Sequence, residues 1–307
     1  MKYLKTIVLV LTCITVQGQK IDSVKSGDIA VFYEVYGNGD PIYLLAGGPG
    51  ITPYGMRTIA EELSKNFQCV LIHQRGTGKT IIPVNDQTIQ IEKYCSDIKS
   101  IKGKLKHKKI TMLGHSWGGM LSMHYSTKYP EDLNKIILVG SGGYNLNFSN
   151  YFGDNITSAL SADDQKTVQI LDELFLQMIT NPNKEKIEKE ISYLLTEIIN
   201  ITSKGYMYDK TKANEVKLTL NDIDTRIHGL MFSSLEKEKW NIKSGLEKLK
   251  VRTLIIQGRQ DPMDLETARE INAAIKGSEL LIIEKSGHFP WIEKPTEFYK
   301  GVMDFLK

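Results

Sequence analysis

The 307-residue sequence lacks the long apolar runs of a membrane-spanning protein, and it contains little cysteine. No apolar segment reaches the roughly 18 residues that a transmembrane helix needs, so we expect no membrane span. Its three cysteines form no CxxC pair and no cluster with histidine at ligand spacing, so we expect no metal site and no cofactor. A net charge of +3 gives no reason to expect nucleic acid or an anionic membrane as a partner.

The N-terminus has the order of a secretory signal peptide. Lys2 and Lys5 precede an apolar run from Ile7 to Val16, and short residues then lead to a cleavage site before Gln19. The run is too short to anchor the protein in a bilayer. We therefore expect residues 1–18 to be a signal peptide and the mature chain to be exported, as a periplasmic or secreted protein.

Export would place Cys69 and Cys95 in an oxidising compartment, where a disulfide could form. Cys69 lies within an apolar run that is typical of a central strand. Buried cysteines commonly act as small hydrophobic residues, so the sequence favours two free thiols but leaves a bridge open.

Short apolar, β-branched runs alternate with helical patterns along most of the chain. This alternation predicts an α/β fold with a mostly parallel central sheet and crossover helices. The run 29–36 resembles an edge hairpin strand, and the other runs resemble strands that are covered on both faces. The expected strands are 29–36, 42–46, 69–73, 110–114, 136–140, 251–257 and 280–283, and the expected helices are 91–105, 118–129, 265–275 and one that begins at Pro295.

Between residues 144 and 249 the strand-like runs give way to amphipathic helical stretches. The pattern predicts a core of residues 19–143 and 250–307, with an all-helical cap of residues 144–249 inserted in it. Ligands of open α/β sheets bind at the carboxyl ends of the strands, so a cap inserted there would cover the active site.

The segment Gly114-His115-Ser116-Trp117-Gly118-Gly119 follows a predicted strand and begins a helix. A serine on such a tight turn projects its hydroxyl above the sheet, and glycines two residues before and after it prevent a clash. We predict that Ser116 is a nucleophile.

A serine hydroxyl needs a base, and the base needs a carboxylate that fixes its tautomer. Of the six histidines, His288 alone follows the last predicted strand within a glycine-flanked loop. Asp261 follows the preceding strand, and serine, acid and histidine then occur in the chain order of this architecture. Asp264 is a competitor, but an acid at a helix N-terminus explains it more simply.

The developing oxyanion needs two N–H donors. The Trp117 amide at the helix N-terminus is one candidate. Gly48, in the segment Ala46-Gly47-Gly48-Pro49-Gly50 after the strand 42–46, is the other, because glycine lets the backbone approach a substrate closely.

Together these motifs resemble the α/β-hydrolase family and, within it, the prolyl iminopeptidase group of serine aminopeptidases. Further segments that carry the resemblance are Gln74-Arg75-Gly76-Thr77-Gly78, Tyr129-Pro130-Glu131 and Gly258-Arg259-Gln260-Asp261. The chain departs from that group at three positions: Ala46 replaces a histidine, His73 replaces an aspartate, and Thr80 stands where a serine is common. The first two changes affect the support of the segment 46–50 and the residues next to it, the oxyanion loop, which carries the candidate donor Gly48.

The resemblance implies a serine hydrolase that acts through an acyl-enzyme, and most specifically an aminopeptidase that releases N-terminal residues such as proline from small peptides. Such an enzyme must hold a cationic amine with a carboxylate. In the group these acids come from the cap, where Glu173, Asp222, Asp224 and Glu236 are all candidates. A carboxylesterase or lipase is the alternative, and a non-catalytic binding protein of the same fold is a remote one. The expected partner is a small molecule or short peptide, and the sequence does not predict the oligomeric state.

Overall fold

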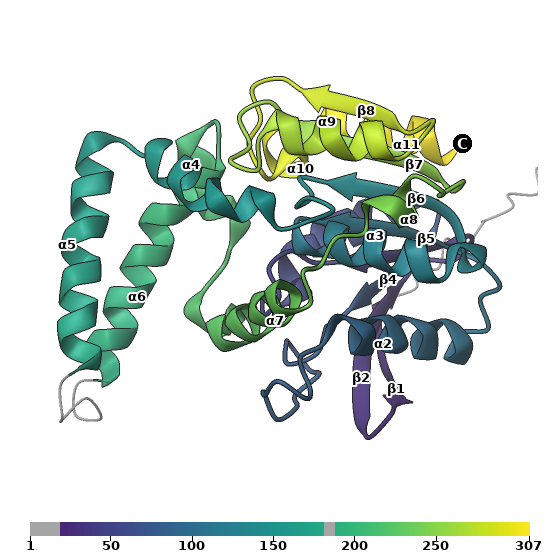
Figure 1. Ribbon diagram of the computed structural model, residues 1–307, viewed down its shortest axis with the longest axis horizontal. Coiled ribbons are helices and arrows are strands. Elements are labelled where there is room, and N and C mark those ends of the chain that lie inside the picture. Colours follow the sequence, from purple (N-terminus) through teal and green to yellow (C-terminus); the bar gives the residue numbers. More distant parts are fainter. Residues whose placement is uncertain (1–18, 181–187) are drawn as a thin grey trace, which may run out of the picture.

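An eight-stranded sheet forms the centre of the computed structural model, which describes residues 19–180 and 188–307 (Figure 1). The signal-peptide prediction for residues 1–18 lies outside the described residues. The strand order is β1-β2-β4-β3-β5-β6-β7-β8. The strands are β1 (Lys20–Ser26), β2 (Ile29–Tyr36), β3 (Pro41–Leu45), β4 (Gln68–Ile72), β5 (Ile110–His115), β6 (Leu133–Val139), β7 (Arg252–Gly258) and β8 (Glu279–Ile283).

Strand β2 runs antiparallel to both of its neighbours, β1 and β4, whereas every pair from β4 to β8 is parallel. The mostly parallel sheet confirms the predicted fold class.

The prediction of 29–36 as an edge strand is wrong. Strand β1 pairs with β2 from Ile29 to Val35, and β1 rather than β2 forms the edge of the sheet. Strand β1 was not predicted because its residues KIDSVKS are mostly polar and at least partly exposed, so they form no apolar run.

Helices cover both faces of the sheet. Apolar residues of α1 and α11 pack on one face, and those of α2, α3 and α9 pack on the other. The helices of the core are α1 (Arg57–Leu63), α2 (Ile91–Lys104), α3 (Trp117–Lys128), α9 (Leu265–Ala274), α10 (Pro290–Glu293) and α11 (Pro295–Leu306). Among the described residues, no helix is both long and apolar enough to cross a membrane.

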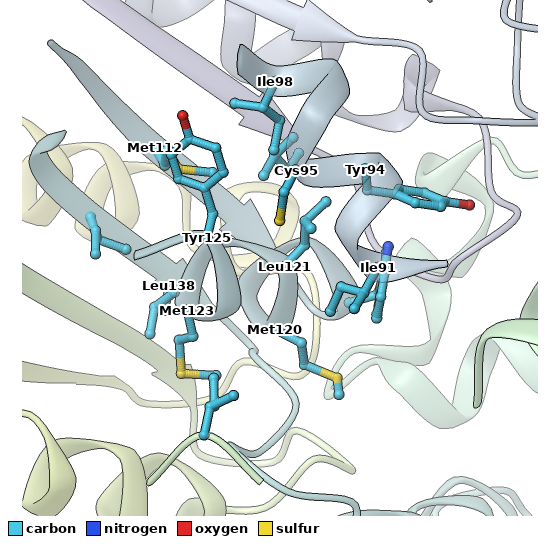
Figure 2. Packing of buried hydrophobic residues seen from close by; sticks show 14 of the residues in the cluster. Ile91, Tyr94, Cys95, Ile98, Met112, Met120, Leu121, Met123, Tyr125 and Leu138 are labelled. Carbon is cyan, nitrogen blue, oxygen red and sulfur yellow. The ribbon is translucent and has the colours of Figure 1, made fainter. Parts of the chain in front are cut away.

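The larger part of the core lies between the sheet and the helices α2 and α3. Figure 2 shows Cys95 and Ile98 of α2 packed with Leu121 and Tyr125 of α3. Helix α3 is buried almost all around, so its sequence has no amphipathic pattern. This burial fixes the helix that begins at the residue after Ser116.

Both cysteines of the described chain are buried and unpaired. Burial raises the pKa of the Cys69 thiol to about 12, and it raises the pKa of the Cys95 thiol as well. The two residues therefore act as small apolar core residues, which is the interpretation that the sequence favoured.

Between β6 and β7 the described residues form helices and no strand of the sheet. Helices α5 and α6 pack side by side and extend away from the sheet, while α7 lies nearer to the core (Figure 1). The segment contains α4 (Phe152–Ser158), α5 (Ala162–Ile179), α6 (Glu188–Ser203), α7 (Thr225–Lys237) and α8 (Lys243–Leu246). Short 3-10 turns occur here and in the core: η1 (Pro53–Met56), η2 (Pro130–Asp132), η3 (Asn147–Asn150), η5 (Lys204–Tyr206), η6 (Lys210–Val216) and η7 (Leu220–Asp222). An inserted helical cap is thus present, and its exact limits at residues 144 and 249 stay a prediction.

A buried carboxylate joins β2 to α1 and to the residue that follows β4. Glu34 of β2 is fully buried and accepts hydrogen bonds from Arg57, His73 and Tyr36. The distances from Arg57 Nη2 to Glu34 Oε1 and from His73 Nε2 to the same oxygen are 2.6 and 3.1 Å. His73 Nδ1 in turn accepts from the Lys79 N–H, so its Nε2 carries the proton that it donates to Glu34. His73, where the resembled group has aspartate, thus pairs with a carboxylate from the neighbouring strand.

Burial acts to raise the pKa of Glu34, but the hydrogen bonds from His73, Arg57 and Tyr36 outweigh it and lower the pKa from 4.5 to about 2. A carboxylate with a depressed pKa stabilises the fold above its unfolded-state pKa, and this contribution is lost as the pH falls through its folded-state pKa. The network therefore contributes fully above about pH 4.5 and is lost toward pH 2.

We predict that Glu34→Gln lowers the free energy of unfolding by about 2 kcal/mol at pH 7, because it removes the charge that accepts from the buried His73 and Tyr36 side chains and from the half-buried Arg57. Urea denaturation of both proteins between pH 7 and pH 2 measures this difference, which should shrink below about pH 4.5. Glu284→Gln is the control, since Glu284 pairs with Arg259 on the exposed surface and should change stability little at any pH. A pH-independent difference for Glu34→Gln would contradict the assignment.

Candidate active site

Ser116 lies on the sharp turn between β5 and α3. Its φ of 55° and ψ of −117° are strained for a residue with a side chain. The turn is held from both sides, because the Ser116 N–H donates to the Val139 carbonyl and the Ser116 carbonyl accepts from the Gly119 N–H, each at 2.9 Å. The surrounding fold thus forces the serine into the conformation that exposes its hydroxyl.

The glycines around Ser116 are required by close backbone contacts. A Cβ at Gly118 would overlap the Leu45 carbonyl of β3, and a Cβ at Gly114 would overlap the Gly118 carbonyl. The spacing of glycines that singled out this motif in the sequence therefore has a steric cause in the structure.

His288 and Asp261 lie together beside this turn. His288 Nδ1 is 2.9 Å from Asp261 Oδ1 and 3.0 Å from Oδ2, and both side chains are almost fully buried. Because a carboxylate accepts, Nδ1 carries the proton and Nε2 is left as the basic nitrogen. No hydrogen bond among the described residues joins Ser116 Oγ to His288, and such bonds often form only when substrate is present.

The loop of His288 is supported by residues that the sequence did not single out for this purpose. The His288 N–H donates to the Tyr206 carbonyl of the cap at 2.8 Å, and His115 Nε2 donates to the His288 carbonyl at 3.0 Å. Burial, and then the neighbouring His288, lower the pKa of His115 well below its usual value, so it is a neutral donor. His115 thus lies beside the candidate base and holds its backbone. Asp264 accepts from the Thr267 N–H at the start of α9 and is a helix cap, as the simpler interpretation expected.

The loop after β3 passes directly over Ser116. A Cβ at Gly47 would lie 3.0 Å from Ser116 Cβ, and Gly48 has a φ of +49°. The Gly48 N–H makes no hydrogen bond to another described residue, and the Trp117 N–H has no acceptor within α3, whose first residue it is. The two predicted oxyanion donors therefore have no acceptor among the described residues, and Gly48 and Trp117 line the same cavity as Ser116.

A cavity of about 700 Å³ opens above these groups. Gly48, Ser116, Trp117 and His288 all line it, while Asp261 lies behind His288. Most of the wall is apolar and comes from the oxyanion loop, η3, α4, α6 and α7. The apolar wall residues include Ile51, Leu146, Phe148, Phe152, Ile199, Leu218, Ile223 and Phe232.

The four candidate acids of the cap have different positions. Glu236 alone among them lines the cavity, and it is exposed at the C-terminal part of α7. Glu173 is exposed on α5, where it accepts a hydrogen bond from Gln169.

Asp222 and Asp224 instead flank the bridge between Ile223 of the cap and Ile51 of the oxyanion loop. Asp222 accepts from the Thr52 hydroxyl at 2.8 Å and forms a capping box with Thr219, while Asp224 caps α7 and pairs with Arg226. The Asp222 carboxylate thus ties the cap to the loop, the Asp224 carboxylate bonds within the cap, and neither residue lines the cavity.

One group of side chains outside the cavity has the composition of a metal site. Ligand atoms of Glu92, Cys95 and His124 lie within 4.8 Å of one another. However, Trp240 Nε1 donates to His124 Nδ1 at 3.1 Å, so Nε2 carries the proton that it donates to Glu92. Burial also raises the pKa of the Cys95 thiol, which keeps the sulfur protonated. These residues do not fit a resident metal ion.

The chain belongs to the alpha/beta hydrolase fold family, which it matches over residues 40–295. It is 22% identical to a proline iminopeptidase of Heyndrickxia coagulans, over 89% of this chain and 93% of that protein. It is 23% identical to a 2-hydroxy-6-oxo-2,4-heptadienoate hydrolase of Pseudomonas putida, over 92% and 95% of the two chains. A solved alpha/beta fold family hydrolase of Bacillus anthracis superposes with a TM-score of 0.69 at 20% identity, covering 94% of this chain and 99% of that one. The protein is thus a hydrolase by family, similar to iminopeptidases and to other α/β hydrolases alike.

Gly140 provides a test of the histidine–aspartate pair. It has a φ of +50°, and a Cβ there would lie 2.8 Å from Asp261 Oδ2 and 3.0 Å from His288 Nδ1. We predict that Gly140→Ala slows the labelling of Ser116 by a fluorophosphonate at least about 10²-fold, because small displacements of a catalytic group cost that much.

The matched control is Gly27→Ala in the β1–β2 turn, which has a φ of +59° and open space around the added Cβ. It carries the same backbone strain and should leave the labelling rate unchanged. Equal effects of the two substitutions would mean that the site does not depend on the pair.

Proposed function

We propose that this protein is a serine hydrolase that cleaves a carboxylic ester, or a related acyl bond, of a small substrate through an acyl-enzyme on Ser116. The observation that carries the proposal is the His288–Asp261 hydrogen bond at 2.9 Å beside a strained serine turn, with Ser116 and His288 both lining a largely apolar cavity. The family of the chain agrees with hydrolysis in general.

The proposed reaction follows from the positions of these groups. Ser116 Oγ attacks the carbonyl carbon while its proton moves to His288 Nε2, and Asp261 stabilises the resulting imidazolium. The Gly48 and Trp117 N–H groups donate to the oxyanion of the tetrahedral intermediate. His288 then gives the proton to the leaving group, and water releases the acid from Ser116 by the same steps in reverse roles.

The chemistry of the cavity wall favours an uncharged acyl group. The wall consists largely of aliphatic and aromatic side chains, and Glu236, which is exposed, is the one carboxylate among the described residues that line it. A substrate ammonium inside such a wall would be costly without a buried carboxylate partner. The cavity therefore supports an esterase-type substrate better than an N-terminal amine.

Release of N-terminal residues from small peptides is the second candidate. It is favoured by the similarity to the proline iminopeptidase of Heyndrickxia coagulans and by the position of Glu236 on the cavity wall. In this case Glu236 would hold the amine, since Asp222 and Asp224 have other partners and Glu173 lies away from the cavity.

A panel of substrates separates the two candidates. We predict that the mature chain, from Gln19, hydrolyses short-chain p-nitrophenyl esters faster than prolyl-, alanyl- or N-blocked prolyl-naphthylamides, because the wall is apolar. Ser116→Ala should lower turnover by about 10⁴-fold or more without unfolding the protein.

Cleavage of the free-amine amides but not of the blocked one would instead establish an aminopeptidase. Glu236→Gln should then raise KM for these amides and leave ester hydrolysis unchanged. No turnover of any substrate would contradict the proposed function.

We also propose that the protein acts outside the cytoplasm, on the strength of Lys2, Lys5 and the apolar run that follows them. We predict that expression of the full chain in a bacterium yields a periplasmic or secreted product whose intact mass corresponds to a start at Gln19. A cytoplasmic product that retains Met1 or Lys2 would contradict export.

A further inference from the structure

Gln74 connects the two segments that provide the candidate oxyanion donors. Trp117 Nε1 donates to Gln74 Oε1 at 2.9 Å, and Gln74 Nε2 donates to the Ala46 carbonyl at 3.0 Å. An indole N–H is only a donor, so the assignment of the amide oxygen and nitrogen of Gln74 follows from chemistry. All three residues are almost fully buried.

The two hydrogen-bond partners of Gln74 each belong to a segment that carries a candidate oxyanion donor. Ala46 immediately precedes Gly47 and Gly48, so its carbonyl belongs to the peptide unit that begins the oxyanion loop. Trp117 provides the opposite donor from its backbone while its indole reaches back to Gln74. One side chain thus links the two segments that carry the candidate donors, and it does not itself line the cavity.

The loop that carries Gln74 is itself fixed. The Gln74 carbonyl accepts from both the N–H and the hydroxyl of Thr77, at 2.9 and 2.8 Å. The preceding residue, His73, is held by the buried Glu34. Gln74 is therefore a rigid link, and its side chain can set the separation of the segments that it joins.

We propose that Gln74 is a positioning residue that sets the distance between the Gly48 and Trp117 N–H groups and thereby the stabilisation of the oxyanion. The proposal rests on the proposed acyl-enzyme chemistry of Ser116. Gln74 acts on the transition state rather than on substrate binding, because its two hydrogen bonds go to the Trp117 indole and the Ala46 carbonyl, in the segments that carry the donors, and its own side chain does not line the cavity.

Gln74→Met tests this role, because methionine has a similar shape but cannot make either hydrogen bond. We predict a kcat that falls about 10-fold to 10²-fold for a p-nitrophenyl ester, somewhat less than the loss of a whole oxyanion donor, with KM changed less than about 3-fold. The rate of Ser116 labelling by a fluorophosphonate should fall by the same factor. In that reaction Ser116 Oγ bonds to phosphorus, fluoride leaves, and the phosphoryl oxygen occupies the oxyanion site.

Gln257→Met is the matched control. Gln257 is a buried glutamine of β7 whose side-chain oxygen and nitrogen have no hydrogen-bond partner among the described residues, and it does not line the cavity. Both variants are compared at temperatures where circular dichroism shows them to be folded. Gln74→Met with kcat and labelling rate within twofold of Gln257→Met would overturn the proposal, as would a change in KM alone.

The labelling experiment separates this inference from the proposed function. If the wild-type chain reacts with the fluorophosphonate but hydrolyses no ester, the proposed substrate class is wrong and the effect of Gln74 is still measured. If Gln74→Met fails to fold, Gln74→Glu is measured between pH 5 and pH 8. Its protonated form can restore both hydrogen bonds, so labelling relative to wild type should increase as the pH falls, and a constant ratio would overturn the proposal.

Discussion

The close contact between α3 and β3 is the constraint on which the site depends. Gly118 lies so near the Leu45 carbonyl that no side chain fits between them, and Ser116 consequently occupies a strained turn at the end of β5. The burial of α3 on almost every side supplies the packing energy that holds this strain. Ser116 and the candidate oxyanion donor at Trp117 are thus fixed by the core of the protein rather than by a surface loop.

The catalytic candidates on the other side of the cavity depend on the cap. The Tyr206 carbonyl holds the backbone of His288, and Ile223 pairs with Ile51 of the oxyanion loop. The segment inserted between β6 and β7 therefore braces two loops of the site in addition to covering it. This arrangement explains why Asp222 and Asp224 have hydrogen-bonding and pairing partners close to the site but do not line the cavity.

The departures from the iminopeptidase pattern also have a structural account. His73 pairs with Glu34 of β2, so a carboxylate is still present at this place but comes from a neighbouring strand. The side chain of Ala46 offers no polar group, but its carbonyl accepts from Gln74, which also binds Trp117. The support of the loop after β3 is therefore built from different residues than the resemblance implied.

The sequence by itself predicted the α/β fold, most strands and the candidate triad, because these depend on local patterns: continuous apolar runs, glycine spacing around Ser116, and loops at strand ends. It placed β2 at the edge, because β1 is polar and only long-range pairing identifies it as a strand. The tertiary structure alone decided which acid faces the cavity, that His115 contacts the His288 backbone, and that Gln74 joins Ala46 to Trp117. Each of these relations links residues far apart in the chain or depends on the orientation of a side chain. Long-range contacts and side-chain orientations produce no periodic pattern in the sequence, so sequence analysis could not predict them.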